Sequence, residues 1–204
     1  MTWVEKYRPK RLLEFVGQEK VVRYAQNVIN NGGEINHLIF HGKSGTGKTT
    51  MAKILANELD VELLMFNASD DRTLSFIRER IIPAMRYKPM FGRYKIIFLD
   101  ETDSMMKDSL FALRSPMELY EKNAKIIFSC NDDGNIIDAI RSRAITFEFR
   151  SLKKENVMSR LRFIADKENV DIDNNILEEI AEKAHGDLRK AINMLEAYYR
   201  GALE

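Results

Sequence analysis

Short apolar runs rich in β-branched and aromatic residues alternate with longer helical patterns along the first three quarters of the chain. Such runs are typical of buried strands, and they recur at residues 38–40, 63–66, 96–99, 126–130 and 145–149. Strands that alternate with helices form parallel sheets covered on both faces. The pattern therefore predicts an α/β fold with a five-stranded parallel sheet between helices.

The last quarter of the chain carries a helical pattern instead. After Arg150 the strand signals stop, and apolar periodicity predicts three amphipathic helices over residues 153–167, 174–184 and 187–199. His185-Gly186 separates the last two, since glycine accepts the left-handed conformation at a helix end. We expect an α/β domain over residues 1–150, followed by a small three-helix domain over residues 151–204.

Composition narrows the class of protein. A chain of 204 residues that is 45% hydrophobic can bury a sizeable core. With 32 Lys and Arg against 31 Asp and Glu, any surface for nucleic acid must be a local patch. The single cysteine, Cys130, excludes an internal disulfide, suits a reducing compartment and is expected to act as a small buried hydrophobe. No long apolar run is present, and the start MTWVEKYRPK is charged, so we expect an intracellular protein without a membrane span or secretory signal.

A glycine-rich loop follows the first predicted strand. The stretch HGKSGTGKTT, residues 41–50, fits the phosphate-binding pattern G-x-x-x-x-G-K-[ST] in full. Its glycines let backbone N–H groups turn toward phosphate oxygens, and the helix that begins near Lys48 points its positive end at them. Lys48 would reach the β- and γ-phosphates of ATP, and the Thr49 hydroxyl would bind Mg²⁺. The candidate contacts to ATP or ADP in this loop are Gly42, Lys43, Ser44, Gly45, Thr46, Gly47, Lys48, Thr49 and Thr50.

Two later strands end in polar residues. Asp100 and Glu101 follow the run at 96–99, at the end of the strand where open α/β sheets bind ligands. Asp100 would hold Mg²⁺ through water, and Glu101 would orient and deprotonate an attacking water. Asn131 follows the run at 126–130 and could hydrogen-bond the γ-phosphate, although asparagine at such a place is also a common turn former.

Several further motifs occur in a fixed order along the chain. They are Trp3-Val4-Glu5-Lys6-Tyr7-Arg8-Pro9, Val16-Gly17-Gln18, Asn67-Ala68-Ser69-Asp70-Asp71-Arg72, Asp100-Glu101, Ser129-Cys130-Asn131, Ser142-Arg143 and Gly186-Asp187-Leu188-Arg189. In these motifs the chain resembles the AAA+ clamp loaders, most closely the small subunits of replication factor C. The resemblance covers essentially the whole sequence.

The resemblance implies roles for individual residues of the nucleotide site. Asn131 corresponds to the residue called sensor 1, and Arg189 to sensor 2, which projects from the helical lid domain to the γ-phosphate. Arg143 matches the arginine finger that acts in the site of a neighbouring subunit; without the resemblance it could equally be a solvated residue before a strand. The family's contacts on the adenine side fall on Val4, Tyr7, Arg8, Pro9 and Val16.

The resemblance also implies partners. DNA-backbone contacts fall on Arg72 and Arg78, one and a half turns apart if the segment after Asp71 is helical. Met90 and Phe91, in a loop bounded by proline and glycine, are candidates for contact with the sliding clamp; the alternative is that they fold onto their own domain.

The chain departs from the family pattern at several places. Ala144 stands where the family has cysteine beside the finger, and Asn135 stands where it has a lysine. Pro116 falls in a segment that is Leu-Arg-Arg-Thr-Met-Glu in the family, and proline tends to kink a helix. The family's helical collar domain has no counterpart in these residues, so we expect the sequence to be part of a longer chain.

The function expected from these observations is that of an ATP-hydrolysing clamp-loader subunit. ATP binding would assemble the subunits on the clamp and on primer-template DNA, and hydrolysis would release them. One alternative is another AAA+ DNA motor, such as a Holliday-junction helicase or an origin-recognition ATPase. A second is a subunit that binds ATP as a structural switch with little turnover, which the presence of both Lys48 and Glu101 disfavours.

Overall fold

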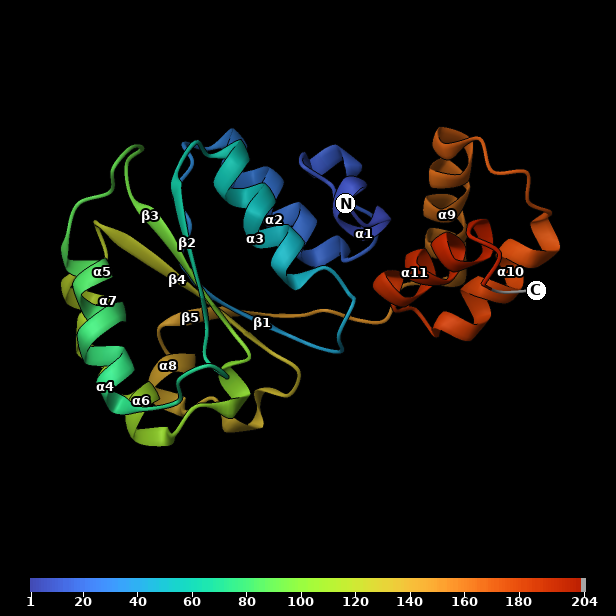
Figure 1. Cartoon of the computed structure of the whole chain (residues 1–204). Helices are drawn as coiled ribbons and strands as arrows, with labels where there is room; N and C mark the ends of the chain where they lie inside the picture. The colour runs from blue at the N-terminus through green and yellow to red at the C-terminus, as the bar shows by residue number, and fades with distance from the viewer. Residues whose placement is uncertain (203–204) are drawn as a thin grey trace.

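A parallel sheet with helices on both faces forms the larger part of the protein, and three further helices lie beside it (Figure 1). This computed structural model describes residues 1–202. The strands are β1 (His37–His41), β2 (Glu62–Asn67), β3 (Lys95–Asp100), β4 (Ala124–Cys130) and β5 (Ala144–Glu148). The predicted five-stranded parallel sheet is confirmed, because every pairing between these strands is parallel.

The order of the strands decides which loops meet. It is β2-β3-β4-β1-β5, so β1 lies between β4 and β5. Residues at the carboxyl ends of the strands are paired with one another: His41 with Cys130, and Asn67 with Asp100. The segments that follow β1, β3 and β4 therefore leave the sheet at one edge, where parallel sheets bind ligands.

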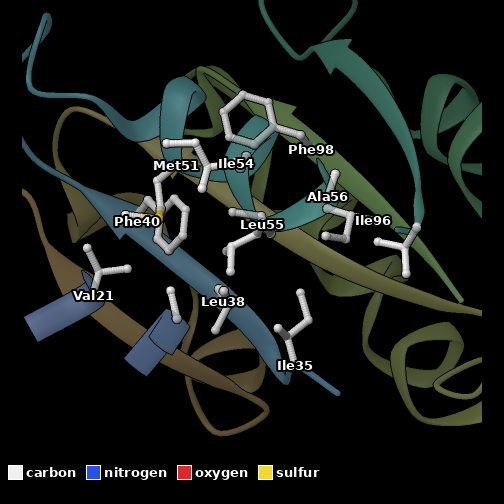
Figure 2. Close-up of a cluster of buried hydrophobic side chains, with 14 of the residues drawn as sticks. Val21, Ile35, Leu38, Phe40, Met51, Ile54, Leu55, Ala56, Ile96 and Phe98 are labelled. Carbon is white, nitrogen blue, oxygen red and sulfur yellow. The ribbon is translucent and has the colours of Figure 1, made fainter. Parts of the chain in front are cut away.

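Alternate residues of the strands face two apolar layers. On one face, Leu38 and Phe40 of β1 pack under α3, whose Met51, Ile54 and Leu55 point at them (Figure 2). This face is covered by α2 (Glu19–Asn30) and α3 (Lys48–Glu58). The other face is covered by α4 (Leu74–Phe76), α5 (Ile82–Arg86), α6 (Lys107–Ala112), α7 (Arg114–Leu119) and α8 (Asp138–Arg141).

The three predicted C-terminal helices are present as α9 (Lys154–Glu168), α10 (Asn174–Ala184) and α11 (Leu188–Tyr199). They pack around an apolar cluster of their own. The α10–α11 turn has positive φ at both His185 (51°) and Gly186 (81°). Residues 203–204 of the predicted helical domain lie outside the described residues, and its boundary at 150/151 stays a proposal.

The first residues of the chain join this C-terminal cluster. The short helix α1 (Trp3–Lys6) contacts α11: the backbone N–H of Trp3 donates to Glu196 Oε2 at 2.9 Å, and the indole ring lies 5.2 Å from the ring of Tyr199. The N-terminal motif is thereby placed between the two parts of the protein (Figure 1).

Two local expectations meet different outcomes. Arg72 precedes α4, and a π-helical turn over Ile77–Ile81 follows, so the segment from Asp71 through Arg78 is not one regular helix. The break expected at Pro116 is found: α6 ends at Ala112 and α7 begins at Arg114. Proline has no N–H to bond the preceding turn, which accounts for the interruption.

No helix among residues 1–202 is long and apolar enough to cross a membrane.

Candidate nucleotide-binding site

A cleft that is partly open to solvent lies between the carboxyl edge of the sheet and the C-terminal helices. Segments that are far apart in the sequence contribute to it, among them the N-terminal motif, the glycine-rich loop, the ends of β3 and β4, and helices α9 and α11. The residues that line it are Val4, Tyr7, Arg8, Pro9, Phe15, Val16, Ser44, Gly45, Thr46, Gly47, Lys48, Thr49, Thr50, Asp100, Glu101, Asn131, Leu152, Arg160, Leu188, Arg189 and Ile192.

The glycine-rich loop presents a row of backbone N–H groups. From Lys43 to Thr50 none of them donates to an acceptor in the described part of the chain, and the first such bond is that of Met51 to the Gly47 carbonyl. Gly45 and Gly47 have φ of 72° and 105°, a backbone conformation that residues with a side chain rarely adopt. Successive free N–H groups at a helix start form an anion-binding site, so the loop fits the phosphates of a nucleotide.

Lys48 is folded back into this loop. Its Nζ donates to the carbonyl oxygens of Gly42 and Lys43, the latter at 3.0 Å. Burial lowers the pKa of the amine, and the nearby Asp100 carboxylate opposes that shift. Gly42 and Lys43 themselves do not line the cleft. Gly42 instead packs against the residue that follows β5, because a Cβ there would lie 2.0 Å from the Phe149 carbonyl oxygen.

Oxygen groups gather where β3 ends. Asp100 accepts a hydrogen bond from Ser129 Oγ at 2.8 Å and a longer one from Thr49 Oγ1 at 3.4 Å. Thr49 and Asp100 are therefore neighbours, as a shared Mg²⁺ would require, and hydroxyl and carboxylate oxygens are ligands this ion prefers. Glu101 is in the left-handed conformation, with φ of 55°, and its carboxylate accepts a hydrogen bond from Ser69 Oγ.

The segment after β4 is fastened to the one after β3. The backbone N–H of Asn131 donates to Asp103 Oδ2 at 3.2 Å, and Asn135 Nδ2 donates to the Asp103 carbonyl at 2.9 Å. These bonds hold Asn131 at the cleft, which it lines. Asn135, at the position where the resemblance implies a lysine, here supplies an amide that bonds this loop.

Helix α11 brings Arg189 to the same cleft. Asp187 caps the helix by accepting from the Lys190 N–H at 2.9 Å, and the Leu188 N–H donates to the Gly45 carbonyl at 3.2 Å. The helix start is therefore in direct contact with the glycine-rich loop. Arg189 is the next residue, exposed at the cleft.

The far half of the cleft is largely apolar. Val4, Tyr7, Pro9 and Val16 line it as expected, and the Arg8 guanidinium reaches the first turn of α3 by donating to Thr50 Oγ1 at 2.8 Å. Five lining residues were not anticipated: Phe15, Leu152, Arg160, Leu188 and Ile192. They belong to no phosphate or acid motif, and only packing between remote segments brings them to the cleft. Leu188 and Ile192 are apolar positions one helical turn apart in the predicted helix over residues 187–199.

Other candidate residues lie away from the cleft. Arg143 Nε donates to Glu118 Oε1 at 2.8 Å, and its Nη1 donates to the Ala139 carbonyl at 2.9 Å. Arg72 and Arg78 are exposed. Met90 and Phe91 are 88% and 54% exposed, so neither is folded into a core. This cleft therefore collects the nucleotide candidates except Gly42 and Lys43, whereas the candidates for partners lie elsewhere.

Comparison with known proteins decides the family. Residues 38–152, more than half of the chain, match the model of the ATPase family associated with various cellular activities, AAA. The chain belongs to the AAA family of ATPases. Residues 159–200 match a second model, the RCF1/5-like AAA+ ATPase lid domain, which coincides with the three C-terminal helices of this AAA chain.

Individual relatives give a more specific match than the family models do. The chain is 44% identical to the replication factor C small subunit of Methanothermobacter thermautotrophicus over 96% of its own length, and 43% identical to that of Thermofilum pendens over 96%. It spans 62% of the length of each of these relatives. Among solved structures, the RuvB Holliday junction branch migration motor of Thermotoga maritima superposes with a TM-score of 0.81 over 93% of this chain and 64% of that one. At 23% identity this likeness shows the fold alone.

Proposed function

We propose that this chain is the ATP-hydrolysing part of a sliding-clamp loader subunit of the replication factor C type. The observation that carries the ATPase assignment is the meeting of free loop N–H groups, Lys48, Asp100, Glu101 and Arg189 at one cleft. The identity with replication factor C small subunits supports the clamp-loader assignment over the Holliday-junction motor, whose likeness is confined to the fold.

Each residue of the cleft has a role in this proposal. The free N–H groups of the glycine-rich loop and Lys48 hold the phosphates, and the apolar half receives the base. Thr49 and Asp100 would hold Mg²⁺, which supplies charge stabilisation on the phosphate oxygens. Glu101 takes the proton of the attacking water, while Asn131 and Arg189 contact the γ-phosphate from the sheet and from the helical lid.

Arg143 completes the site of a neighbouring subunit. It does not line its own cleft, and it is held at the protein surface by Glu118, whose side chain is 64% exposed. An arginine inserted from a neighbour neutralises charge in the transition state. Hydrolysis would then depend on assembly with other clamp-loader subunits.

Arg72 and Arg78 contact the backbone of primer-template DNA, and Met90 and Phe91 contact the clamp, in the same proposal. All four residues are exposed, so their side chains are accessible to a partner. Clamp titration of Phe91→Ala tests the last contact; unchanged affinity would remove it. The protein would work inside the cell, where its substrates are.

The decisive experiment compares ATP binding and turnover of the wild type and Glu101→Gln, with clamp and primer-template DNA present. Turnover should be lost and ATP affinity kept, because the amide cannot accept the water's proton. The matched control is Glu155→Gln, an exposed glutamate of α9 outside the cleft, which should keep both. Equal wild-type and Glu101→Gln rates would favour the non-hydrolysing switch, and DNA unwinding without clamp would favour another AAA+ motor.

A further inference from the structure

The side chain of Arg143 is held from two sides within its own chain. Its Nε donates to Glu118 Oε1 at 2.8 Å, and its Nη2 lies 2.6 Å from the same oxygen. Its Nη1 donates to the Ala139 carbonyl at 2.9 Å and to Ser142 Oγ at 3.1 Å. Glu118 belongs to α7, whereas Ala139 belongs to α8, so two separate elements fix this guanidinium.

These contacts leave one corner of the guanidinium available. Apart from its contact with Glu118, Nη2 has no partner among residues 1–202, although it carries two N–H groups. The side chain of Arg143 is 26% exposed. Because all five N–H groups of arginine lie in one plane, bonds from Nε and Nη1 also set the direction in which Nη2 points.

Glu118 is presented from a fixed part of α7. The preceding residue, Met117, is 1% exposed, and its carbonyl accepts a hydrogen bond from His37 Nε2 at 3.1 Å. His37 Nδ1 accepts from the Ile126 N–H at 2.9 Å, so Nε2 is the nitrogen that carries the proton. This histidine ties α7 to β1 and β4 one residue before Glu118, and the carboxylate therefore starts from a rigid position.

The ion pair is better suited to orienting Arg143 than to stabilising the fold. The side chain of Glu118 is 64% exposed, and ion pairs in contact with solvent add little to stability. A long arginine side chain without a partner populates many rotamers, and it must lose that freedom when it binds a phosphate. Arg72 and Arg78, the other arginines proposed for partner contacts, take part in no ion pair within residues 1–202.

We propose that Glu118 is a positioning residue for the reaction: its carboxylate orients Arg143 so that Nη2 points at the nucleotide of the neighbouring subunit. This inference rests on the role of Arg143 proposed above. Glu118 touches no reacting atom and acts only through Arg143. Its effect therefore appears in the neighbour's site and not in the cleft of its own chain.

The first test is ATP turnover and ATP affinity of Glu118→Ala, with clamp and primer-template DNA present. The maximal rate should fall about five- to tenfold, because a misdirected catalytic group loses part of its effect, while ATP affinity and the unliganded Tm stay at the wild-type values. Glu118→Gln keeps an oxygen acceptor without the charge and should lie between the two. The matched control is Glu121→Ala, which removes an exposed glutamate that pairs with Lys125 on the same segment and should keep the full rate.

Two further measurements separate positioning from a structural role. Arg143→Ala with Glu118→Ala should turn over no more slowly than Arg143→Ala alone, since Glu118 has nothing left to orient. Glu118→Ala subunits diluted into an excess of Glu101→Gln subunits should reach the rate of wild-type subunits diluted in the same way, because their neighbours then supply intact Arg143–Glu118 pairs. An additive loss in the double variant, or a deficit that persists on dilution, would place the effect elsewhere and overturn the proposal.

The remaining outcomes also decide. An unchanged rate in Glu118→Ala, next to a collapsed rate in Arg143→Ala, would overturn this inference and leave the role of Arg143 intact. A faster rate in Glu118→Ala would mean that the carboxylate restrains Arg143, which contradicts positioning. If Arg143→Ala itself keeps the wild-type rate, the proposed role of Arg143 fails, and the positioning role of Glu118 fails with it.

Discussion

The backbone N–H of Leu188 donates to the carbonyl oxygen of Gly45 at 3.2 Å, which joins the last lid helix to the phosphate-binding loop. The approach is so close that a Cβ on Gly45 would lie 1.8 Å from Asp187 Oδ1. Asp187 also caps α11. The position of Arg189, the neighbour of Leu188, is thereby coupled to the conformation of the loop that binds the phosphates.

Gly45→Ala should weaken nucleotide binding more than tenfold. The new methyl group collides with Asp187, and φ of 72° costs about 1–2 kcal/mol for a residue with a side chain. The matched control is Gly201→Ala, which has nearly the same φ, 71°, and no atom within 4 Å of the new Cβ. ATP titration of both variants checks this; equal affinities would show that the contact between loop and lid does not shape the site.

Arg143→Ala should lower ATP turnover by about 10³-fold or more and leave ATP affinity unchanged. The first effect follows from loss of transition-state charge neutralisation, the second from the absence of Arg143 from its own cleft. Steady-state turnover as a function of protein concentration, with clamp and DNA, is the measurement. Turnover that is indifferent to concentration and to Arg143 would contradict action in a neighbour's site.

Mixing two inactive variants sharpens that test. Arg143→Ala keeps a complete cleft but supplies no finger, whereas Glu101→Gln supplies a finger and lacks its own base. A mixture of the two should recover part of the wild-type turnover, because Glu101→Gln subunits complete the sites of their Arg143→Ala neighbours. No recovery in a mixture that is shown to co-assemble would mean that the finger acts within one chain.

Asp133 should make the fold sensitive to acid. Its carboxylate accepts from Arg141 Nη1 at 2.6 Å, and this hydrogen bond holds the pKa of Asp133 below its usual value. A lowered pKa stabilises the folded state above the pKa of an unfolded aspartate, about 3.9, and this contribution disappears as the pH falls through the folded pKa. Urea unfolding at a series of pH values is the measurement. Below about pH 4, the free energy of unfolding should fall less in Asp133→Asn than in the wild type. The control Asp171→Asn, at an exposed position, should follow the wild type.

Cys130 should be unreactive in the native protein. Burial raises the pKa of its thiol to about 12, and its side chain is 1% exposed. Because the thiolate is the reactive form, a thiol reagent at pH 8 should label the chain only after denaturation. Since the sequence holds one cysteine, the labelled amount reports the unfolded fraction directly. Rapid labelling of the folded protein would show that β4 opens far more often than a core strand should.

Local patterns were sufficient for the elements of the fold. All five strands and the three C-terminal helices could be predicted, because apolar periodicity follows directly from which faces are buried. The π-helical turn at Ile77–Ile81 and the start of α4 after Arg72 could not be, since no spacing signal separates that segment from regular helix. Pro116 was informative because a proline beyond the first turn of a helix removes an N–H that the helix needs.

The sequence by itself determined the phosphate half of the site, because the spacing of the loop glycines, Lys48 and Thr49 is a local property of the backbone, and because Asp100 and Asn131 end strands that must be parallel. Only the tertiary structure decided the other half. Arg160, Leu152 and Ile192 reach the cleft from segments more than a hundred residues beyond the N-terminal motif, which also lines it. No periodicity records such contacts, since they depend on how the lid packs against α1 and the glycine-rich loop rather than on any residue's neighbours in the chain.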